Sequence, residues 1–203
     1  MTWLVAAMLA FAPPAKAKRF PGWEETEDEA RARYALLARA IEAAVLASNG
    51  SGYSDKTEAA LLLALALKES DLARDVDVGP CYRTGAWKKR CDGGTSFSVW
   101  QLKPYRTSDG TRVTGAMIQA DRTLAAKKAL ALALGSLGQC KKLPEADRLS
   151  GYVKGSCQEG HQGSAERIAK WRAVEGWKAK PLSKRRGRPW RCSPIRCSPS
   201  TAR

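Results

Sequence analysis

The sequence predicts a mainly α-helical protein with one folded domain and short appendages. Alanine and leucine dominate the apolar stretches, and alternating runs of Val, Ile and Thr, which would indicate strands, are scarce. The apolar run Ala59–Leu67 is uninterrupted, and Asp55 and Glu58 ahead of it have the spacing of a helix start. A helix that is apolar on all sides belongs inside a core. With 203 residues the chain is long enough to bury one.

The N-terminus has the pattern of an export signal. Residues 3–11 form a short apolar run, and an Ala-x-Ala cleavage motif ends at Ala17. The run is too short to span a bilayer as a helix. No positively charged residue precedes Trp3, which departs from the usual pattern. We expect residues 1–17 to be a signal peptide, 18–23 a linker and 24–177 the folded domain of an exported protein, periplasmic or extracellular.

An amphipathic helix is expected from Thr26 to about Ser48. Thr26 and Glu29 have the spacing of a capping box, in which each side chain satisfies a backbone N–H of the other residue. Apolar side chains recur along one stripe of this segment, whereas Arg31 and Arg33 fall largely elsewhere. We therefore expect these arginines to lie on a solvated face.

Shorter helices and polar connections are expected in the rest of the domain. Residues 75–97, rich in glycine, should form a long surface loop or small hairpin, and a loop of that length is usually functional or mobile. Residues 96–102 would be a helical turn or two, and 103–114 a second polar loop. Helices are expected over residues 116–137, 144–152 and 164–172, with Trp171 and Trp177 closing the core.

The six cysteines indicate disulfide bonds and an oxidising compartment. None lies in a Cys-x-x-Cys pair and His161 is the single histidine, so neither a zinc site nor any other cofactor is expected. An even number of widely spaced cysteines favours disulfides, and six reduced thiols in the cytosol are the alternative. The expected pairs join neighbours along the chain: Cys81–Cys91, Cys140–Cys157 and Cys192–Cys197.

The formal charge of +15, from 35 basic and 20 acidic residues, predicts attraction to a polyanion such as nucleic acid, an anionic membrane or cell-wall polymer. Residues 178–203 contain nine basic residues, four prolines and no acidic residue. Such a segment buries too little apolar area to fold by itself. This basic tail would bind anionic wall polymer or a membrane surface, or serve only to keep the protein soluble.

The central apolar run leads directly to a carboxylate, Glu69. A carboxyl group at the margin of a core is partly desolvated, which raises its pKa. A raised pKa is what a general acid needs near neutral pH. The alternative is that Glu69 is an ordinary solvated residue at a helix end.

Three short motifs follow one another along the chain: Glu69-Ser70, Ser96-x-Ser98-x-x-Gln101 and Tyr152-x-x-Gly155. Together they resemble the signature motifs of the lysozyme-like lytic transglycosylases, a group similar in fold to goose-type lysozyme. In that family a Glu-Ser pair ends a buried helix, a Ser-x-Gly-Leu-Met-Gln segment follows, and a Tyr-Asn motif lies on a later helix. The resemblance covers roughly residues 55–177. Here Ser98 replaces the glycine, Trp100 the methionine and Val153 the asparagine.

The resemblance implies a lysozyme-like helical domain, with the disulfide-tied loop or hairpin beside its cleft. It further implies action on peptidoglycan glycan strands. We expect a monomer, with no specific nucleic-acid partner. Glu69 would be the catalytic acid and then base for the MurNAc-GlcNAc β-1,4 bond, with the muramoyl 6-hydroxyl attacking in place of water. Ser70 would orient Glu69. The substrate-binding residues would be Ser96, Ser98 and Gln101 along the cleft, and Tyr152 near the catalytic carboxyl.

Other interpretations stay open at the level of sequence. Hydrolysis would usually need a second carboxylate, and the four candidates, Asp71, Asp75, Asp77 and Asp92, are not distinguished by any pattern. Transglycosylation is therefore favoured over a goose-type-like lysozyme activity. Trp87 and Trp100 would stack on sugars or pack in the core, and Tyr152 is equally suited to a core position. A non-catalytic basic protein that binds wall polymer or nucleic acid is the alternative from another class.

Overall fold

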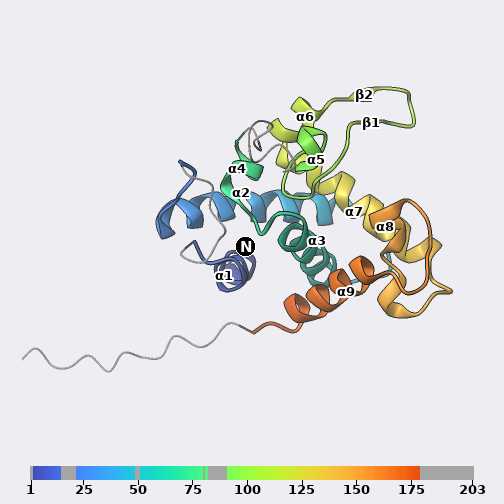
Figure 1. Ribbon diagram of the computed structural model, residues 1–203. Helices are drawn as coiled ribbons and strands as arrows, with labels where there is room; N and C mark the ends of the chain where they lie inside the picture. Colours follow the sequence, from blue (N-terminus) through green and yellow to red (C-terminus); the bar gives the residue numbers. More distant parts are fainter. Residues whose placement is uncertain (1, 15–21, 49–50, 80, 82–90, 179–203) are drawn as a thin grey trace, which may run out of the picture.

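The computed structural model describes residues 2–14, 22–48, 51–79, 81 and 91–178, and these form a mainly α-helical domain with one small hairpin (Figure 1). The mainly α class is therefore confirmed. The longer helices are α1 (Thr2–Phe11), α2 (Glu27–Leu46), α3 (Asp55–Ser70), α7 (Arg122–Gln139) and α9 (Gln162–Glu175). The shorter ones are α4 (Arg74–Asp77), α5 (Cys91–Gly94), α6 (Gly115–Ala120), the 3-10 turn η2 (Glu145–Asp147) and α8 (Ser150–Lys154). Strands β1 (Tyr105–Arg106) and β2 (Arg112–Val113) pair antiparallel.

Helix α3 lies at the centre of the domain. Every residue of Ala59–Leu67 is buried, as the apolar run predicts. The helix packs against α9, α2, α7 and α1, and Figure 1 shows it enclosed by these neighbours. Its N-cap is Ser54, whose hydroxyl accepts from the Thr57 amide at 3.2 Å. It ends where Asp71 takes φ 52°, and this places Glu69 in the last turn, at the edge of the core.

Helix α2 has the predicted capping box. The Glu29 amide donates to the Thr26 hydroxyl at 3.2 Å, and the Thr26 amide donates to Glu29 Oε2 at 2.8 Å. The expectation that Arg33 is solvated is wrong. Its side chain is only 6% exposed and forms ion pairs with Glu25 at 2.5 Å and with Asp77 at 3.2 Å. Arg33 thus joins α2 to α4, because two carboxylates compensate its burial.

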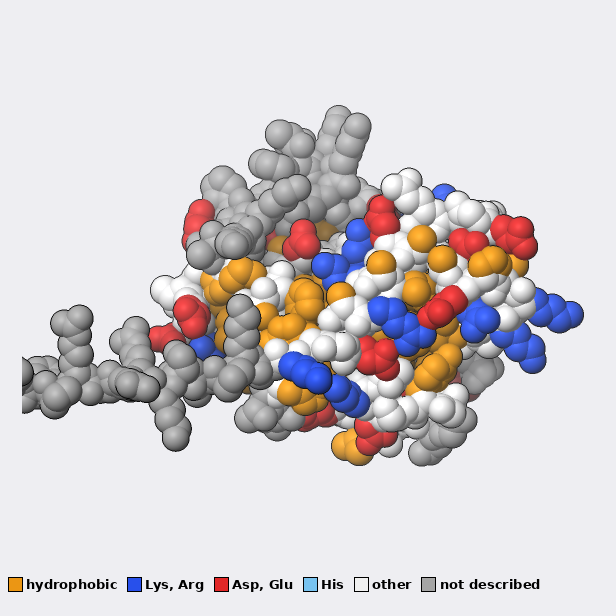
Figure 2. Space-filling view, turned by 90° about the horizontal axis from the view of Figure 1, so that it is seen from below, with side chains coloured by type: hydrophobic (Ala, Val, Ile, Leu, Met, Phe, Trp, Pro, Cys, Tyr) orange, Lys and Arg blue, Asp and Glu red, His pale blue; other side chains and the backbone are white. Residues whose placement is uncertain are grey.

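Helix α1 packs against α2 and α3, with Leu4, Ala7 and Met8 buried. The Tyr34 hydroxyl of α2 donates to the Ala12 carbonyl at 2.7 Å. Figure 2 shows hydrophobic side chains gathered on the face where α1 lies. Residues expected to form a signal peptide therefore contribute to the core. Cleavage after Ala17 stays a prediction, since Ala17 lies outside the described residues. Among those residues, no helix is both long and apolar enough to cross a membrane.

The long helix expected over residues 116–137 is two helices, α6 and α7, separated by Asp121. Asp121 has extended backbone, φ −118° and ψ 98°, and its side chain caps α7 by accepting from the amides of Thr123 and Leu124 at 2.8 and 2.9 Å. The helix expected over residues 144–152 is likewise divided, into η2 and α8. At Asp121 a local side-chain cap therefore interrupts a segment that composition alone favours as one continuous helix.

The expected loops contain short regular elements. The segment 103–114 holds the β1–β2 hairpin, with Tyr105 opposite Val113. Residues 96–102 are not helical, since they form a turn closed by a bridge between Phe97 and Leu102. The segment 75–97, expected as a loop or hairpin, contains part of α4 and all of α5, while residues 82–90 lie outside the described ranges.

Two of the expected disulfides, Cys81–Cys91 and Cys140–Cys157, are present. The third pair, Cys192–Cys197, lies outside the described residues, as does the tail beyond Lys178. Two disulfides are typical of proteins from oxidising, exported environments. Trp171 is buried against α3 and its indole N–H donates to the Thr57 carbonyl at 3.1 Å. Trp177 packs partly buried against the same core.

Candidate active site

A groove of about 590 Å³ lies at the C-terminal end of α3. Its walls come from α3, α5, the 100–105 segment, α7, α8 and α9, with Glu69, Asp92, Gln101, Tyr105, Tyr152 and Arg167 among the lining residues. Three of the predicted site residues, one from each motif, therefore meet in one groove: Glu69, Gln101 and Tyr152. The Cys81–Cys91 disulfide also reaches it, because Cys91 contributes to the lining.

The Glu69 carboxylate is largely withdrawn from water and paired with Arg167. Its side chain is 15% exposed and that of Arg167 is 13% exposed. Arg167 Nε donates to Glu69 Oε1 at 2.7 Å, and a second guanidinium nitrogen lies 2.5 Å from the same oxygen. Burial nevertheless raises the pKa of Glu69, because desolvation outweighs the opposing charges of Arg167 and Lys68. Asp92 adds to the rise in the pKa of Glu69 through its like charge.

Tyr152 spans the groove between α8 and the Ser96–Gln101 turn. Its hydroxyl donates to the Trp100 carbonyl at 3.3 Å, and its amide donates to the Ser136 hydroxyl at 3.0 Å. Burial raises the pKa of the phenol, helped by the nearby Glu69 charge. Tyr152 is thus a protonated donor fixed beside the carboxyl. Trp100 packs in the core, with its indole N–H donating to the Leu62 carbonyl at 3.0 Å, whereas Trp87 lies outside the described residues.

Ser70 has a different role from the one expected. Its hydroxyl donates to the Ala66 carbonyl at 2.9 Å and accepts from the Leu72 amide at 3.2 Å. These bonds terminate α3, and Ser70 is not among the residues that line the groove. Among the described residues, Ser70 therefore forms no direct hydrogen bond to Glu69, the contact that an orienting role would need.

The serines of the middle motif, Ser96 and Ser98, are buried and hydrogen-bond to residues in and next to the groove wall. Ser98 has φ +62°, its amide donates to Gln119 Oε1 at 3.0 Å, and its hydroxyl accepts from the Trp100 amide at 3.3 Å. Gln101, with φ +51°, donates from Nε2 to the Ser98 carbonyl at 2.9 Å. The Ser96 hydroxyl donates to Asp92 Oδ2 at 2.7 Å. Neither serine lines the groove, whereas Gln101 does, and Trp100 beside it also contributes to the lining.

Asp92 is the one of the four candidate second carboxylates that lines the groove. Its side chain is 65% exposed and lies 3.5 Å from Lys103 Nζ. Asp71 is exposed at the end of α3, and Asp75 is buried elsewhere. Asp77 is fully engaged with two arginines, Arg33 at 3.2 Å and Arg122 at 2.8 Å.

Sequence reasoning missed several lining residues, Arg167, Tyr105 and Lys128 among them. Arg167 lies on α9, within the helix expected over residues 164–172, but its pairing with Glu69 has no local sequence signal. Tyr105 and Lys128 lie together in the lining, with Lys128 Nζ 4.3 Å from the centre of the Tyr105 ring. This pair ties the β1–β2 hairpin to α7.

The chemistry that the groove can support depends on its carboxyl group and the side chains around it. In the described part of the chain no group of three or more His, Cys, Asp or Glu side chains could hold a metal ion. His161 caps α9, its Nδ1 accepting from the Ser164 amide at 3.1 Å. The groove instead presents a shielded carboxyl with a raised pKa beside a phenol and cations, which suits proton donation to a leaving oxygen. Comparisons of the chain with protein-family models, curated proteins and solved structures found no match.

Proposed function

We propose that the protein cleaves peptidoglycan glycan strands at the MurNAc-GlcNAc β-1,4 bond, with Glu69 as general acid and then general base. One observation carries the proposal: the largely shielded Glu69 carboxyl, whose pKa is raised, shares a groove with Gln101 and Tyr152. Glycosidic cleavage needs a protonated carboxyl beside the leaving oxygen. The three motifs that resemble those of lytic transglycosylases each contribute at least one residue to this groove.

The backbone of the middle motif gives independent support. The resembled family has glycine where this chain has Ser98. Ser98 has φ +62°, a conformation that glycine adopts without the penalty that other residues incur. The substitution therefore keeps the backbone shape that a glycine at this position would favour. This turn brings Gln101 into the groove.

In the proposed reaction, Glu69 donates its proton to the glycosidic oxygen as the bond from that oxygen to C1 of the muramoyl sugar breaks. The muramoyl 6-hydroxyl then attacks C1 and gives its proton to the Glu69 carboxylate. The products are a 1,6-anhydro sugar end and a new free 4-hydroxyl, and Glu69 is again protonated. Arg167 would stabilise the carboxylate while the proton is absent, since it already lies 2.7 Å from Oε1.

Asp92 favours a second candidate activity, hydrolysis of the same bond by a goose-type-like lysozyme mechanism. A second carboxylate in the groove could activate water for attack at C1. Mass analysis of released muropeptides distinguishes the two reactions, because transglycosylation leaves anhydro ends and hydrolysis leaves reducing ends. Asp92→Asn should leave a transglycosylase active, whereas it should greatly slow a hydrolase that uses Asp92 as its base.

Glu69→Gln tests the enzyme hypothesis itself. Clearing of a cell-wall suspension should fall by about 10²-fold or more, the range that general acid catalysis supplies. The matched control is Glu166→Gln, which removes an exposed glutamate paired with Lys68 at 2.7 Å outside the groove. Equal clearing by wild type and Glu69→Gln would exclude Glu69 as the acid.

A non-catalytic basic protein is the alternative from another class. If the intact protein clears no wall suspension but binds DNA with a steep salt dependence, this alternative is favoured. On the proposed function, the tail of residues 178–203 holds an exported, monomeric enzyme on anionic wall polymer or membrane, through nine basic side chains that carry no compensating acid.

A further inference from the structure

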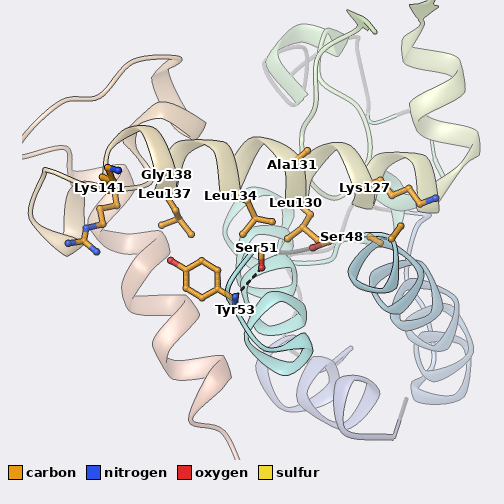
Figure 3. Close-up of a pocket in the computed structure, with 13 residues that line it drawn as sticks. Ser48, Ser51, Tyr53, Lys127, Leu130, Ala131, Leu134, Leu137, Gly138 and Lys141 are labelled. Carbon is orange, nitrogen blue, oxygen red and sulfur yellow. Dashed lines mark hydrogen bonds between the residues drawn. The ribbon is translucent and has the colours of Figure 1, made fainter. Parts of the chain in front are cut away.

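A second groove, of about 570 Å³, lies along α7 and shares no lining residue with the Glu69 groove (Figure 3). Its opposite wall is the C-terminal end of α2 and residues 51–53. Its volume is within the range of small-molecule binding sites. The proposed glycan chemistry makes no use of this groove.

The floor of the second groove is apolar. Its accessible apolar side chains are Ala131 and the half-buried Leu134 on α7 and Ala47 just beyond α2, while Leu130 and Leu137 beneath them belong to the core at 2% and 6% exposure. In Figure 3 the leucines project from α7 toward the Tyr53 side of the groove. An apolar strip of this kind accommodates an alkyl chain by removing it from water.

The charged lining residues are all basic: Lys127, Lys141 and Arg148. Lys127 and Lys141 are fourteen positions apart on and just beyond α7, which corresponds to about 21 Å of helix. Lys141 and Arg148 share one end, and Figure 3 shows the Tyr53 hydroxyl directed toward that end. Arg148 is held by a bond from Nε to the Leu143 carbonyl at 3.2 Å. This end therefore offers three donors to an anionic group.

The middle of the groove disfavours an anion. The hydroxyls of Ser48 and Ser51 both line it, but both donate to the carboxylate of Glu58, Ser48 at 2.7 Å. Glu58 is buried behind them. Because both serine hydroxyls donate their protons to Glu58, neither can donate to a negative ligand group. Such a group is better placed at the Lys141 end.

Gly138 leaves the groove open at a cost to the helix. It lies inside α7, where glycine is less favourable than alanine by about 1 kcal/mol. A side-chain carbon at Gly138 would meet no atom within 4 Å, so packing within the chain does not require glycine. Gly135, one turn earlier, has the same open surroundings but does not line the groove. The two glycines form a matched pair for substitution.

We propose that the second groove binds an anionic amphiphile with a single alkyl chain, its head between Lys141 and Arg148 and its chain across Leu134 and Ala131. Charge complementarity selects this occupant, since the charged lining is entirely basic and the floor is apolar. The chain's own tail is excluded as occupant because residues 178–203 are basic and carry no acidic residue.

Calorimetric titration of the full chain with sodium dodecanoate, below its critical micelle concentration, tests the proposal. We expect saturable binding with one site per chain. Dodecyl phosphate is the second probe, and the tighter of the two identifies the head as carboxylate or phosphate. Dodecanol, of equal chain length but neutral, should bind at least about tenfold more weakly. Binding of dodecanol as tight as that of both anions, or no saturable binding of either, would overturn the proposal.

Two matched pairs of variants locate the site. Lys141→Glu should weaken dodecanoate binding by at least about tenfold, and Lys127→Glu by clearly less, since the head lies at the Lys141 end. Gly138→Leu should block the groove, while Gly135→Leu should leave binding unchanged. Equal effects within either pair would contradict the assignment. Glu69→Gln should bind dodecanoate as wild type does, so this result is independent of the proposed enzyme activity.

Discussion

The guanidinium of Arg167 lies 2.7 Å from the carboxylate of Glu69, although 98 positions separate the two residues. The pair joins the end of the buried helix α3 to α9 at the edge of the groove. Burial and the arginine act in opposite directions on Glu69: desolvation favours the neutral acid, and the cation favours the carboxylate. The balance between them sets the pH range in which Glu69 can donate a proton.

If the proposed function holds, removing the Arg167 charge should shift the pH profile of wall cleavage. The acid works in its protonated form, so activity falls as pH rises through the pKa of Glu69. Arg167→Gln removes a cation that lowers this pKa, and the alkaline limb of the kcat/KM profile should move to higher pH. Arg167→Lys keeps a positive charge and should shift the limb less. A limb that stays in place, or moves to lower pH, would show that Arg167 does not control the Glu69 proton.

The central helix and its carboxylate were predictable because their signals are local. An uninterrupted apolar run can only be buried, and all of Ala59–Leu67 is. The Thr26–Glu29 capping box is likewise contained within four residues. The three motifs also named Glu69, Gln101 and Tyr152, which line one groove.

The features that sequence reasoning missed depend on distant partners or on local competition. Arg33 was expected in solvent because its stripe on α2 is polar, but its partner Asp77 lies 44 positions away. Arg167 was unmarked for the same reason. The helix breaks at Asp121 because its side chain accepts hydrogen bonds from backbone amides and so competes with the helix. The spacing of apolar residues gives no indication of such a break.

Asp77 should be one of the strongest single determinants of stability. Its side chain is 2% exposed and is bonded by Arg33 and Arg122, which connects α4 to α2 and α7. Asp77→Asn leaves buried guanidinium charge less compensated and should lower the free energy of unfolding by about 3–5 kcal/mol. Denaturant titration would measure it. As a control, Glu27→Gln removes an exposed partner of Arg31 and should change stability little; a similar loss in both variants would contradict this ranking.

We expect residue 115 to tolerate only glycine, because the ring of Phe97 occupies the space that a side chain would need. A side-chain carbon at Gly115 would overlap the ring of Phe97, so Gly115→Ala must displace the ring. We expect a loss of about 1–3 kcal/mol in the free energy of unfolding. Because Phe97 pairs with Leu102 in the turn that carries Gln101, wall cleavage should fall as well. Gly135→Ala, where nothing lies within 4 Å, should instead stabilise α7. Equal stability of the two variants would contradict the steric argument.

Ser98 should behave as a position that prefers glycine. Ser98→Gly and Ser98→Ala both remove the hydroxyl that accepts from the Trp100 amide, but only glycine relieves the strain of φ +62°. Thermal and denaturant unfolding should therefore show Ser98→Gly more stable than Ser98→Ala by about 1–2 kcal/mol. Ser98→Gly should also retain wall cleavage, because the amide of residue 98 still donates to Gln119 and keeps the turn that places Gln101. If Ser98→Ala proved as stable and as active as Ser98→Gly, the positive φ would not be a constraint on this turn, and its agreement with the family's glycine would no longer support the proposed function.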